Sequence, residues 1–126
     1  MSTSIKIIVG KTILSGELYE SPCARQIIAC LPIETNPDEW GDEFYFSIPV
    51  RVSLDDSATP KVKIGDIGYW PPGTAMAIFF GSTPMSTGGD PVPASAVNLV
   101  GRVLGDATVL KRERGADKIR IEKADP

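Results

Sequence analysis

One stretch constrains the fold of this chain more than any other: residues 65–81, which read G-D-I-G-Y-W-P-P-G-T-A-M-A-I-F-F-G. Gly65-Asp66 and Pro72-Gly73 are turn dipeptides, and Pro72-Gly73 suits the centre of a type II turn. The residues after the second turn are almost all apolar, which predicts a strand buried on both faces. The stretch therefore predicts a tight hairpin that sets the register of the strands beside it. It contains one carboxylate and no strong nucleophile or base, so it carries no chemistry of its own.

Length and composition are those of an ordinary globular protein. The 126 residues predict one domain, 1–126, and the 42% hydrophobic and 23% charged content is typical of such chains. No apolar run approaches the roughly 18–20 residues of a membrane helix, and the N-terminus lacks a secretory pattern. We therefore expect a cytoplasmic protein that does not enter a membrane. The net charge of −3 argues against nucleic acid as the main partner.

The absence of histidine from the sequence limits the possible chemistry. It excludes Ser-His-Asp and Cys-His catalysis, as well as zinc or iron sites built on histidine. Cys23 and Cys30 are seven positions apart, which places them on one helix face and matches no redox or zinc pattern, so we expect free thiols. A metal site made of carboxylates alone stays open in the acidic segment 34–43, but we expect neither a metal nor a cofactor.

Hydrophobic periodicity and turn signals predict seven or eight short strands and one main helix. The helix spans 21–31, with Ser21 as its N-cap, Pro22 at the first helical position and an apolar stripe facing the sheet. Asp106 is placed to cap a second, short helical turn that runs through Leu110. The expected strands are 5–9, 12–18 after a Gly10-Lys11 turn, 43–50, 62–64, the two strands of the 65–81 hairpin, 96–104 and 118–122. This pattern predicts a mainly β fold, a closed or nearly closed barrel with the helix over one opening.

Charge is distributed unevenly along the chain. Every charged residue in the segment 34–43 is acidic, whereas the tail 111–123 is predominantly basic. The two segments can meet within the fold or between the subunits of a homo-oligomer, or each can simply form solvated surface.

Several sequence blocks resemble a known family. Residues 40–50 read W-G-D-E-F-Y-F-S-I-P-V, which is similar to the W-G-x-E-x-Y-F-x-x-P-V signature of a family of small prokaryotic cyclophilin-like proteins. G-D-I-G-Y-W-P-P-G, F-F-G-S-T-P-M-S and P-A-S-A-V-N-L-V-G-R-V resemble its other blocks in the same order, so that the blocks span 40–103. The resemblance implies the cyclophilin fold, a closed eight-stranded barrel with helices at its ends. The function of that family is not established.

Prolyl isomerisation, the activity of true cyclophilins, does not transfer on this resemblance. Their active site depends on an arginine in an F-H-R stretch followed by F-x-x-Q-G-G-D, and this chain has only Gly88-Gly89-Asp90 as a superficial echo. The arginine favours a twisted amide in the transition state. Arg51 and Arg102 are the strand arginines of the central region that are able to replace it in space.

Aromatic residues and one glutamate are the first candidates for a binding site. Tyr45, Tyr69, Trp70 and Phe80 line either an apolar groove or simply the core. Trp40 is either a plug over the barrel end or a lid that stacks on a ligand. Glu43 is either a surface charge or, facing inward beside aromatic rings, a proton acceptor with a raised pKa and the one weak catalytic candidate.

The irregular loop 82–95 and the strand after it supply the remaining candidates, Thr83, Pro84, Met85, Ser95 and Asn98. The hydroxyl groups either cap turns or face a ligand. Asn98 lies between apolar neighbours on a strand, where its amide either braces a loop or reads a ligand amide.

Three functions are consistent with these features. The first is a binding module for a peptide or a small amide-bearing molecule, with its pocket between the Tyr45 strand, the Tyr69-Trp70 turn and loop 82–95. The second is an enzyme, either a prolyl isomerase with relocated groups or an amide-processing catalyst that uses Glu43. The third is a partner subunit, because cyclophilin-like domains also occur in amide-hydrolysing multi-subunit enzymes; this last is analogy from fold.

Overall fold

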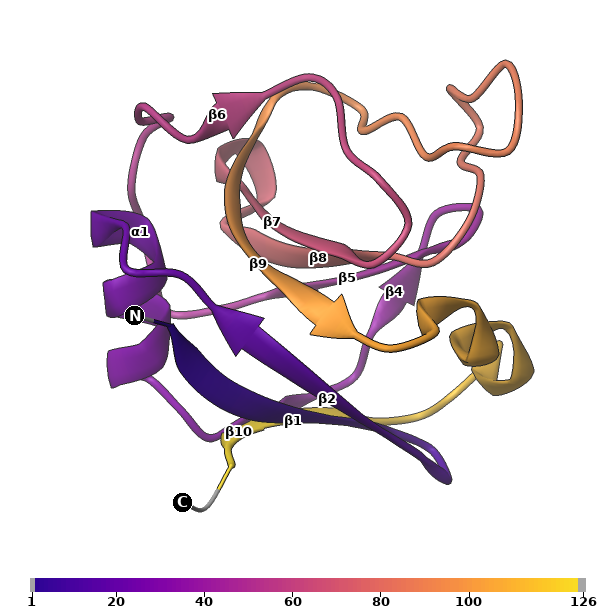
Figure 1. The fold of residues 1–126 in the computed structure, drawn as a ribbon, viewed down its shortest axis with the longest axis horizontal. Coiled ribbons are helices and arrows are strands. Elements are labelled where there is room, and N and C mark those ends of the chain that lie inside the picture. The colour runs from indigo at the N-terminus through magenta and orange to yellow at the C-terminus, as the bar shows by residue number, and fades with distance from the viewer. Residues whose placement is uncertain (1, 125–126) are drawn as a thin grey trace.

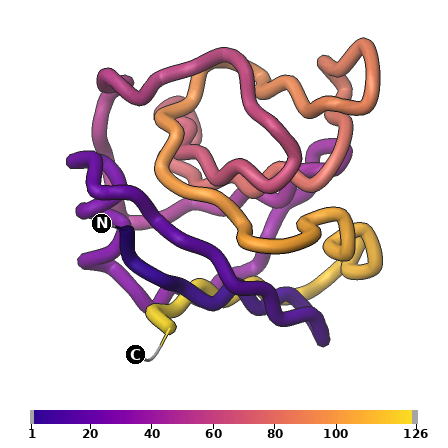
Figure 2. Tube along the Cα trace, in the orientation of Figure 1, coloured from indigo at the N-terminus to yellow at the C-terminus, as the bar shows by residue number. Residues whose placement is uncertain are grey.

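Figures 1 and 2 show a computed structural model of the chain, which describes residues 2–124. One antiparallel sheet of ten strands curls around the main core, with an α-helix and two 3-10 helices beside it. The strands are β1 (Thr3–Val9), β2 (Thr12–Leu18), β3 (Ile33–Thr35), β4 (Asp38–Glu39), β5 (Glu43–Ser47), β6 (Ala58–Thr59), β7 (Asp66–Trp70), β8 (Ala75–Phe79), β9 (Val97–Leu104) and β10 (Ile119–Lys123). The helices are α1 (Pro22–Ala29), η1 (Pro71–Gly73) and η2 (Ala107–Glu113).

The sheet is open in its hydrogen bonding. Its order is β3-β10-β1-β2-β9-β7-β8-β5-β4, and β6 pairs with β9 from outside this path. Only Asn36 and Pro37 separate β3 from β4 in the chain, yet no ladder joins these two end strands within residues 2–124. The mainly β prediction is confirmed, but the predicted closed eight-stranded barrel is not. Both end strands are very short, and Pro37 has no N–H to donate to a closing ladder.

β1 and β2 form the hairpin that the Gly10-Lys11 turn predicted. Gly10 has a φ of 56°, which a two-residue turn with glycine first requires. β1 lies between β2 and β10, and its alternate residues Ile5, Ile7 and Val9 are fully buried. Turn chemistry and period-2 alternation therefore account for this part of the sheet.

α1 begins where the sequence predicted and ends earlier. The Ser21 hydroxyl accepts a hydrogen bond from the Ala24 N–H at 3.2 Å, and Pro22 is the first helical residue. The helix ends at Ala29 rather than at residue 31, because Pro32 cannot continue a helix and restricts the residue before it. Its buried residues, which pack into the main core, are Cys23, Ala24 and Ile27. Cys23 and Cys30 are free, as expected.

β5 and β8 present different residues to their two faces, and this division positions the site. On β5, Phe44 enters the main core while Glu43 and Tyr45 face the other side. On β8, Ile78 enters the main core while Phe79 faces the other side, so the strand is buried on both faces as predicted. The second face carries a smaller apolar cluster of Val62, Ala77, Phe79 and Val97, flanked by Tyr45 and Trp70.

One predicted strand is absent from the structure, and three short strands form where none was predicted. Residues 62–64 form no strand: Val62 is buried in the second cluster, while Ile64 is 41% exposed. β6 instead forms between the expected strands 43–50 and 62–64, where no strand was predicted, through its pairing with β9. No strand was predicted over residues 33–39 either, yet β3 and β4 form there through pairing with β10 and β5. These short strands depend on distant partners, which local patterns do not reveal.

The turn after Trp70 also differs from its prediction. Pro71–Gly73 form the 3-10 helix η1 rather than a type II turn. The positive φ falls on Thr74, at 44°, instead of on Gly73. Two consecutive prolines hold φ near −65°, which suits a helical turn and delays the reversal of the chain by one residue.

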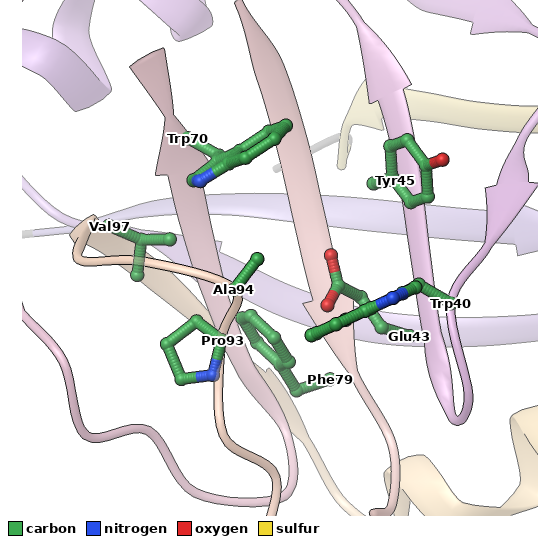
Figure 3. Close-up of a pocket in the computed structure, with 8 residues that line it drawn as sticks. All are labelled: Trp40, Glu43, Tyr45, Trp70, Phe79, Pro93, Ala94 and Val97. Carbon is green, nitrogen blue, oxygen red and sulfur yellow. The ribbon is translucent and has the colours of Figure 1, made fainter. Parts of the chain in front are cut away.

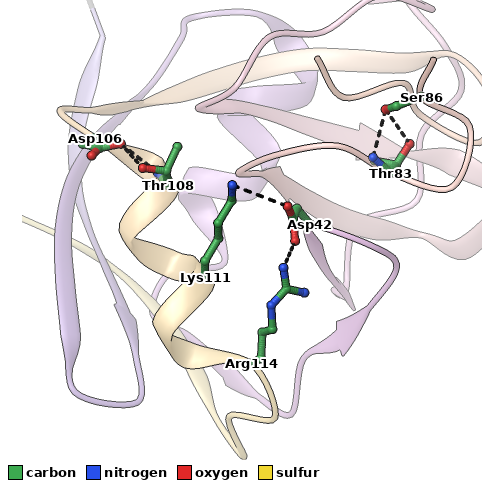
Figure 4. Close-up of polar contacts among 7 residues, drawn as sticks. All are labelled: Asp42, Thr83, Ser86, Asp106, Thr108, Lys111 and Arg114. Atoms are coloured by element: carbon green, nitrogen blue, oxygen red, sulfur yellow. Dashed lines mark hydrogen bonds and ion pairs between the residues drawn. The ribbon is translucent and has the colours of Figure 1, made fainter. Parts of the chain in front are cut away.

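The acidic segment and the basic tail meet within the chain. Asp42 is 8% exposed and pairs with Arg114 and, at 3.9 Å, with Lys111 (Figure 4). Both cations come from η2 or the residue after it, and Asp106 caps η2 as predicted by accepting a hydrogen bond from the Thr108 N–H at 3.0 Å. A second, exposed set of ion pairs joins Glu34 to Lys118 and Arg120.

Candidate functional site

A pocket of about 170 Å³ opens on the second face of the sheet (Figure 3). Its walls come from the β4–β5 turn, from β5, β7 and β8, from the loop that precedes β9, and from the start of β9. The lining residues are Trp40, Glu43, Tyr45, Trp70, Phe79, Pro93, Ala94 and Val97. Four of them are aromatic, and Glu43 is the acidic residue among them.

Strand register explains why a hollow forms here. Glu43 lies opposite Phe79 and Tyr45 lies opposite Ala77 on the β5–β8 ladder, so large and small residues alternate across the floor. Gly68 of β7 lies opposite Ala77 on the other side. A Cβ atom on Gly68 would approach Val97 Cγ2 to 2.8 Å, so the glycine lets Val97 lie against the strand. The sequence therefore builds a thin floor with bulky walls.

Trp70 is held by a hydrogen bond to the loop wall next to it. Its indole Nε1–H donates to Ser95 Oγ at 2.7 Å. Ser95 belongs to the loop that contributes Pro93 and Ala94 to the pocket. This bond ties the end of β7 to the loop and fixes the plane of the indole ring.

Trp40 reaches the pocket from a constrained turn. The Trp40 N–H donates to the Glu43 carbonyl oxygen at 3.0 Å, which closes the β4–β5 connection. Gly41 has a φ of 60°, and a Cβ atom there would lie 2.8 Å from Thr83 Cα. The turn thus requires glycine for both its dihedral angle and the space beside it, and it places the Trp40 ring beside the Glu43 carboxyl (Figure 3).

Glu43 is the polar centre of the pocket. The residue is 8% exposed, and its carboxyl receives no hydrogen bond and no ion pair from residues 2–124. Its oxygens are not sealed from the pocket, because no fully buried side-chain oxygen among the described residues lacks a hydrogen-bond partner. Burial alone raises the pKa of this carboxyl from 4.5 to about 7. Figure 3 shows the carboxyl group surrounded by the rings of Trp40, Tyr45, Trp70 and Phe79. Such a group exchanges a proton near neutral pH and, when ionised, is an uncompensated negative charge in an apolar setting.

Loop 82–95 is braced from within. Thr83 is buried, and its hydroxyl donates to the Val92 carbonyl oxygen at 2.5 Å. The Thr83 N–H donates to Ser86 Oγ at 2.9 Å (Figure 4), and that hydroxyl donates to the Asp90 carbonyl oxygen at 2.6 Å. These bonds cross-link the two ends of the loop and so fix the wall that Pro93 and Ala94 provide.

The structure brings together four of the predicted site residues, Trp40, Glu43, Tyr45 and Trp70. Ser95 contacts the site through Trp70, and Thr83 supports it from the loop. Pro84 and Met85 lie exposed on the same loop and do not line the pocket.

Three predicted residues serve the fold instead. Phe80 packs in the main core against Phe44, with ring centroids 4.8 Å apart. Tyr69 is fully buried, and its hydroxyl donates to the Val50 carbonyl oxygen at 2.6 Å. Asn98 braces the loop before β6: its Oδ1 accepts from the Asp55 N–H at 2.8 Å and its Nδ2 donates to the Ser53 carbonyl oxygen at 3.1 Å.

Four lining residues were not predicted from the sequence: Phe79, Pro93, Ala94 and Val97. Phe79 was not predicted because every residue of its strand is apolar, so the sequence does not show which alternate residues face the main core and which face the other side. Its register against Glu43 is the signal that separates it from Phe80. Pro93 and Ala94 lie in an irregular loop whose path no periodicity reveals.

Neither arginine considered for prolyl isomerisation lies at this pocket. Arg51 is exposed, and Arg102 donates from Nε to the Glu17 carboxylate at 2.6 Å on the surface. No group of three or more acidic residues or cysteines within residues 2–124 is arranged to hold a metal ion. No helix in the same range is long and apolar enough to cross a membrane.

Comparison with known proteins identifies the relatives of the chain. A family model described as "Cyclophilin-like" matches residues 3–122. The chain belongs to this cyclophilin-like family. Among solved structures, it is similar to the solution structure of the hypothetical protein AF2241 from Archaeoglobus fulgidus. The two share 35% sequence identity and a TM-score of 0.80, over 98% of this chain and 95% of the other. A search of curated proteins finds no match.

Proposed function

We propose that this cyclophilin-like protein is a binding module whose pocket holds one small chemical group, carried by a peptide or by a small amide-bearing molecule. The observation that supports the proposal is the preformed aromatic pocket around a single carboxyl. Concave, mostly apolar sites with a few convergent polar groups are the usual form of ligand sites.

The volume of the pocket limits the size of the group that it can bind. An engineered apolar cavity of roughly 150 Å³ binds benzene, whereas drug-sized ligands occupy roughly 300–1,000 Å³. At about 170 Å³ the pocket accommodates one side chain or one head group. A longer ligand extends from it across the loop wall formed by Pro93 and Ala94.

Nuclear magnetic resonance tests the proposal, because both tryptophans of the chain line the pocket. A set of small amides, aromatics, amines and acids is titrated into labelled protein. We expect some members to shift the indole N–H signals of Trp40 and Trp70 while the β1 amides stay in place. Ala94→Leu, which fills the pocket mouth, removes the shifts, whereas Thr87→Leu on the same loop preserves them. A set that leaves both indole signals unmoved contradicts the proposal.

An enzyme that uses Glu43 as a proton acceptor is the second candidate. The observation that favours it is the pKa of about 7, which suits general acid–base catalysis. Such an enzyme loses turnover in Glu43→Gln while retaining ligand shifts. Prolyl isomerisation has less support, because no arginine lines the pocket within residues 2–124. We expect no catalysed exchange of an X-Pro peptide, whose uncatalysed isomerisation takes tens of seconds or more.

Other functional expectations from the sequence remain predictions. They are the cytoplasmic location, a homo-oligomeric state and the role of a partner subunit in a larger amide-hydrolysing complex. Gel filtration of the isolated chain checks the second, and co-purification checks the third.

A further inference from the structure

Two adjacent carboxylates of this chain differ in their access to positive charge. Asp42 has its cations within the fold, Arg114 and Lys111. Glu43 is equally buried, and no cation or hydrogen-bond donor among residues 2–124 reaches its carboxyl. A buried carboxylate without a partner is unfavourable. A ligand that supplies positive charge therefore gains more binding free energy here than it would beside a solvated acid.

The walls around Glu43 favour the same kind of ligand. Trp40, Tyr45, Trp70 and Phe79 surround the carboxyl (Figure 3). The faces of aromatic rings carry partial negative charge and attract organic cations, most strongly when the ring is tryptophan and the site is desolvated. An anion meets repulsion from both the carboxylate and the rings.

We infer that the pocket binds a small organic ammonium group, with Glu43 as its counter-ion and the four aromatic rings as its walls. This inference rests on the proposed binding function and specifies its ligand class. The ammonium group belongs either to a free small molecule or to the side chain of a peptide.

Alkylated ammonium groups fit the pocket better than a bare primary ammonium. A primary ammonium carries three N–H donors that each need an acceptor. The acceptors among the lining side chains are the Glu43 carboxyl and the Tyr45 hydroxyl. A quaternary ammonium has no N–H to satisfy and contacts aromatic faces through its methyl groups.

The test compares choline with 3,3-dimethylbutan-1-ol, which has the same shape without the charge. Calorimetry at pH 8 should give choline at least a tenfold higher affinity, because cation–π attraction and the ion pair are both absent from the alcohol. Glu43→Gln should reduce that difference to the part that cation–π attraction contributes, because it removes the ion pair and keeps the rings. Asp90→Asn, which removes the same charge from the exposed part of loop 82–95, should leave it unchanged.

The pH dependence provides a second readout on the unmodified protein. Choline binds the ionised form of Glu43, so its affinity should fall as the pH is lowered from 8 to 5. With a pKa of about 7 the ionised fraction falls by roughly 100-fold over that range, which is the upper limit of the affinity loss. Tyr45 is the other titratable side chain that lines the pocket, and the neighbouring Asp42 is paired with Lys111 and Arg114. Choline should in turn lower the pKa of Glu43, which carboxyl-carbon signals report even if Glu43→Gln fails to fold.

The outcomes separate this inference from the proposed function. Equal affinity for choline and the alcohol overturns the inference and leaves a neutral-ligand pocket. Indole shifts with amides or acids but none with choline overturn it as well. Absence of binding by every compound overturns both. A capped trimethyllysine peptide that binds at least tenfold more tightly than choline assigns the ammonium group to a peptide, whereas comparable affinities assign it to a free small molecule.

Discussion

At the scale of single residues, Asp42 and Glu43 show how neighbouring acids acquire different properties. Asp42 lies against η2, where two cations compensate its charge. Glu43 begins β5 and faces the aromatic pocket, where the cost of losing water is uncompensated. The direction of the pKa shift at Glu43 follows from that contrast, since burial penalises the charged form of an acid.

The free energy of unfolding should therefore depend on pH through Glu43. An acid whose folded pKa is raised holds more protons in the folded state, so stability falls as the pH rises from about 4.5 to about 7. Glu43→Gln removes this penalty and should be more stable than the parent above pH 7, by roughly 3 kcal/mol at most. The two proteins should converge near pH 4.5. Denaturant unfolding across this range measures the difference, and a pH-independent gap would contradict it.

At the scale of elements, loop 82–95 is a wall of the site because Thr83 cross-links it. Thr83→Val keeps the shape of the side chain but leaves the Val92 carbonyl without its donor. We expect a loss of about 1 kcal/mol in stability and faster hydrogen exchange in residues 84–92. Thr83→Ser retains the hydroxyl and should behave like the parent. Identical exchange in the valine and serine variants would remove Thr83 from this role.

The attachment of η2 to the β4–β5 turn is a second element-scale feature. Asp42→Asn and Arg114→Gln should each destabilise the fold, because each removes one partner of an ion pair whose acid is buried. The effect should be modest, since Arg114 is half exposed. A double-mutant cycle should give a coupling energy of about 1 kcal/mol, reduced by salt. Additive effects of the two substitutions would show that the pair does not anchor η2.

Elements that depend on residues close by in the sequence could be predicted. Elements that form only by pairing with distant segments of the chain could not. The Gly10-Lys11 hairpin, the Ser21 cap and the alternation of β5 each depend on residues within one turn or strand. The strands β3, β4 and β6 form only through pairing with β10, β5 and β9. The aromatic character of the site and Glu43 could be predicted, because aromatic residues and a lone acid stand out in the sequence. The choice of Phe79 over Phe80 required the register of β5 against β8.

At the scale of the whole molecule, the two faces of the sheet are packed differently. One face encloses the main core and the other carries the pocket. Phe79→Leu and Phe80→Leu form a matched pair at adjacent, fully buried positions. Each should cost about 1–2 kcal/mol in unfolding. Only Phe79→Leu should shift the Trp70 indole signal and weaken ligand binding; equal effects on binding would show that the two faces are coupled.

The pKa of Glu43, measured from its carboxyl-carbon NMR signal, is the most direct test of a pocket built around a desolvated acid. The structure predicts a value of about 7 in the free protein, and the ammonium proposal predicts a lower value when choline is bound. A value near 4.5 that choline does not change would mean that Glu43 is solvated, and it would contradict the pocket on which both proposals rest.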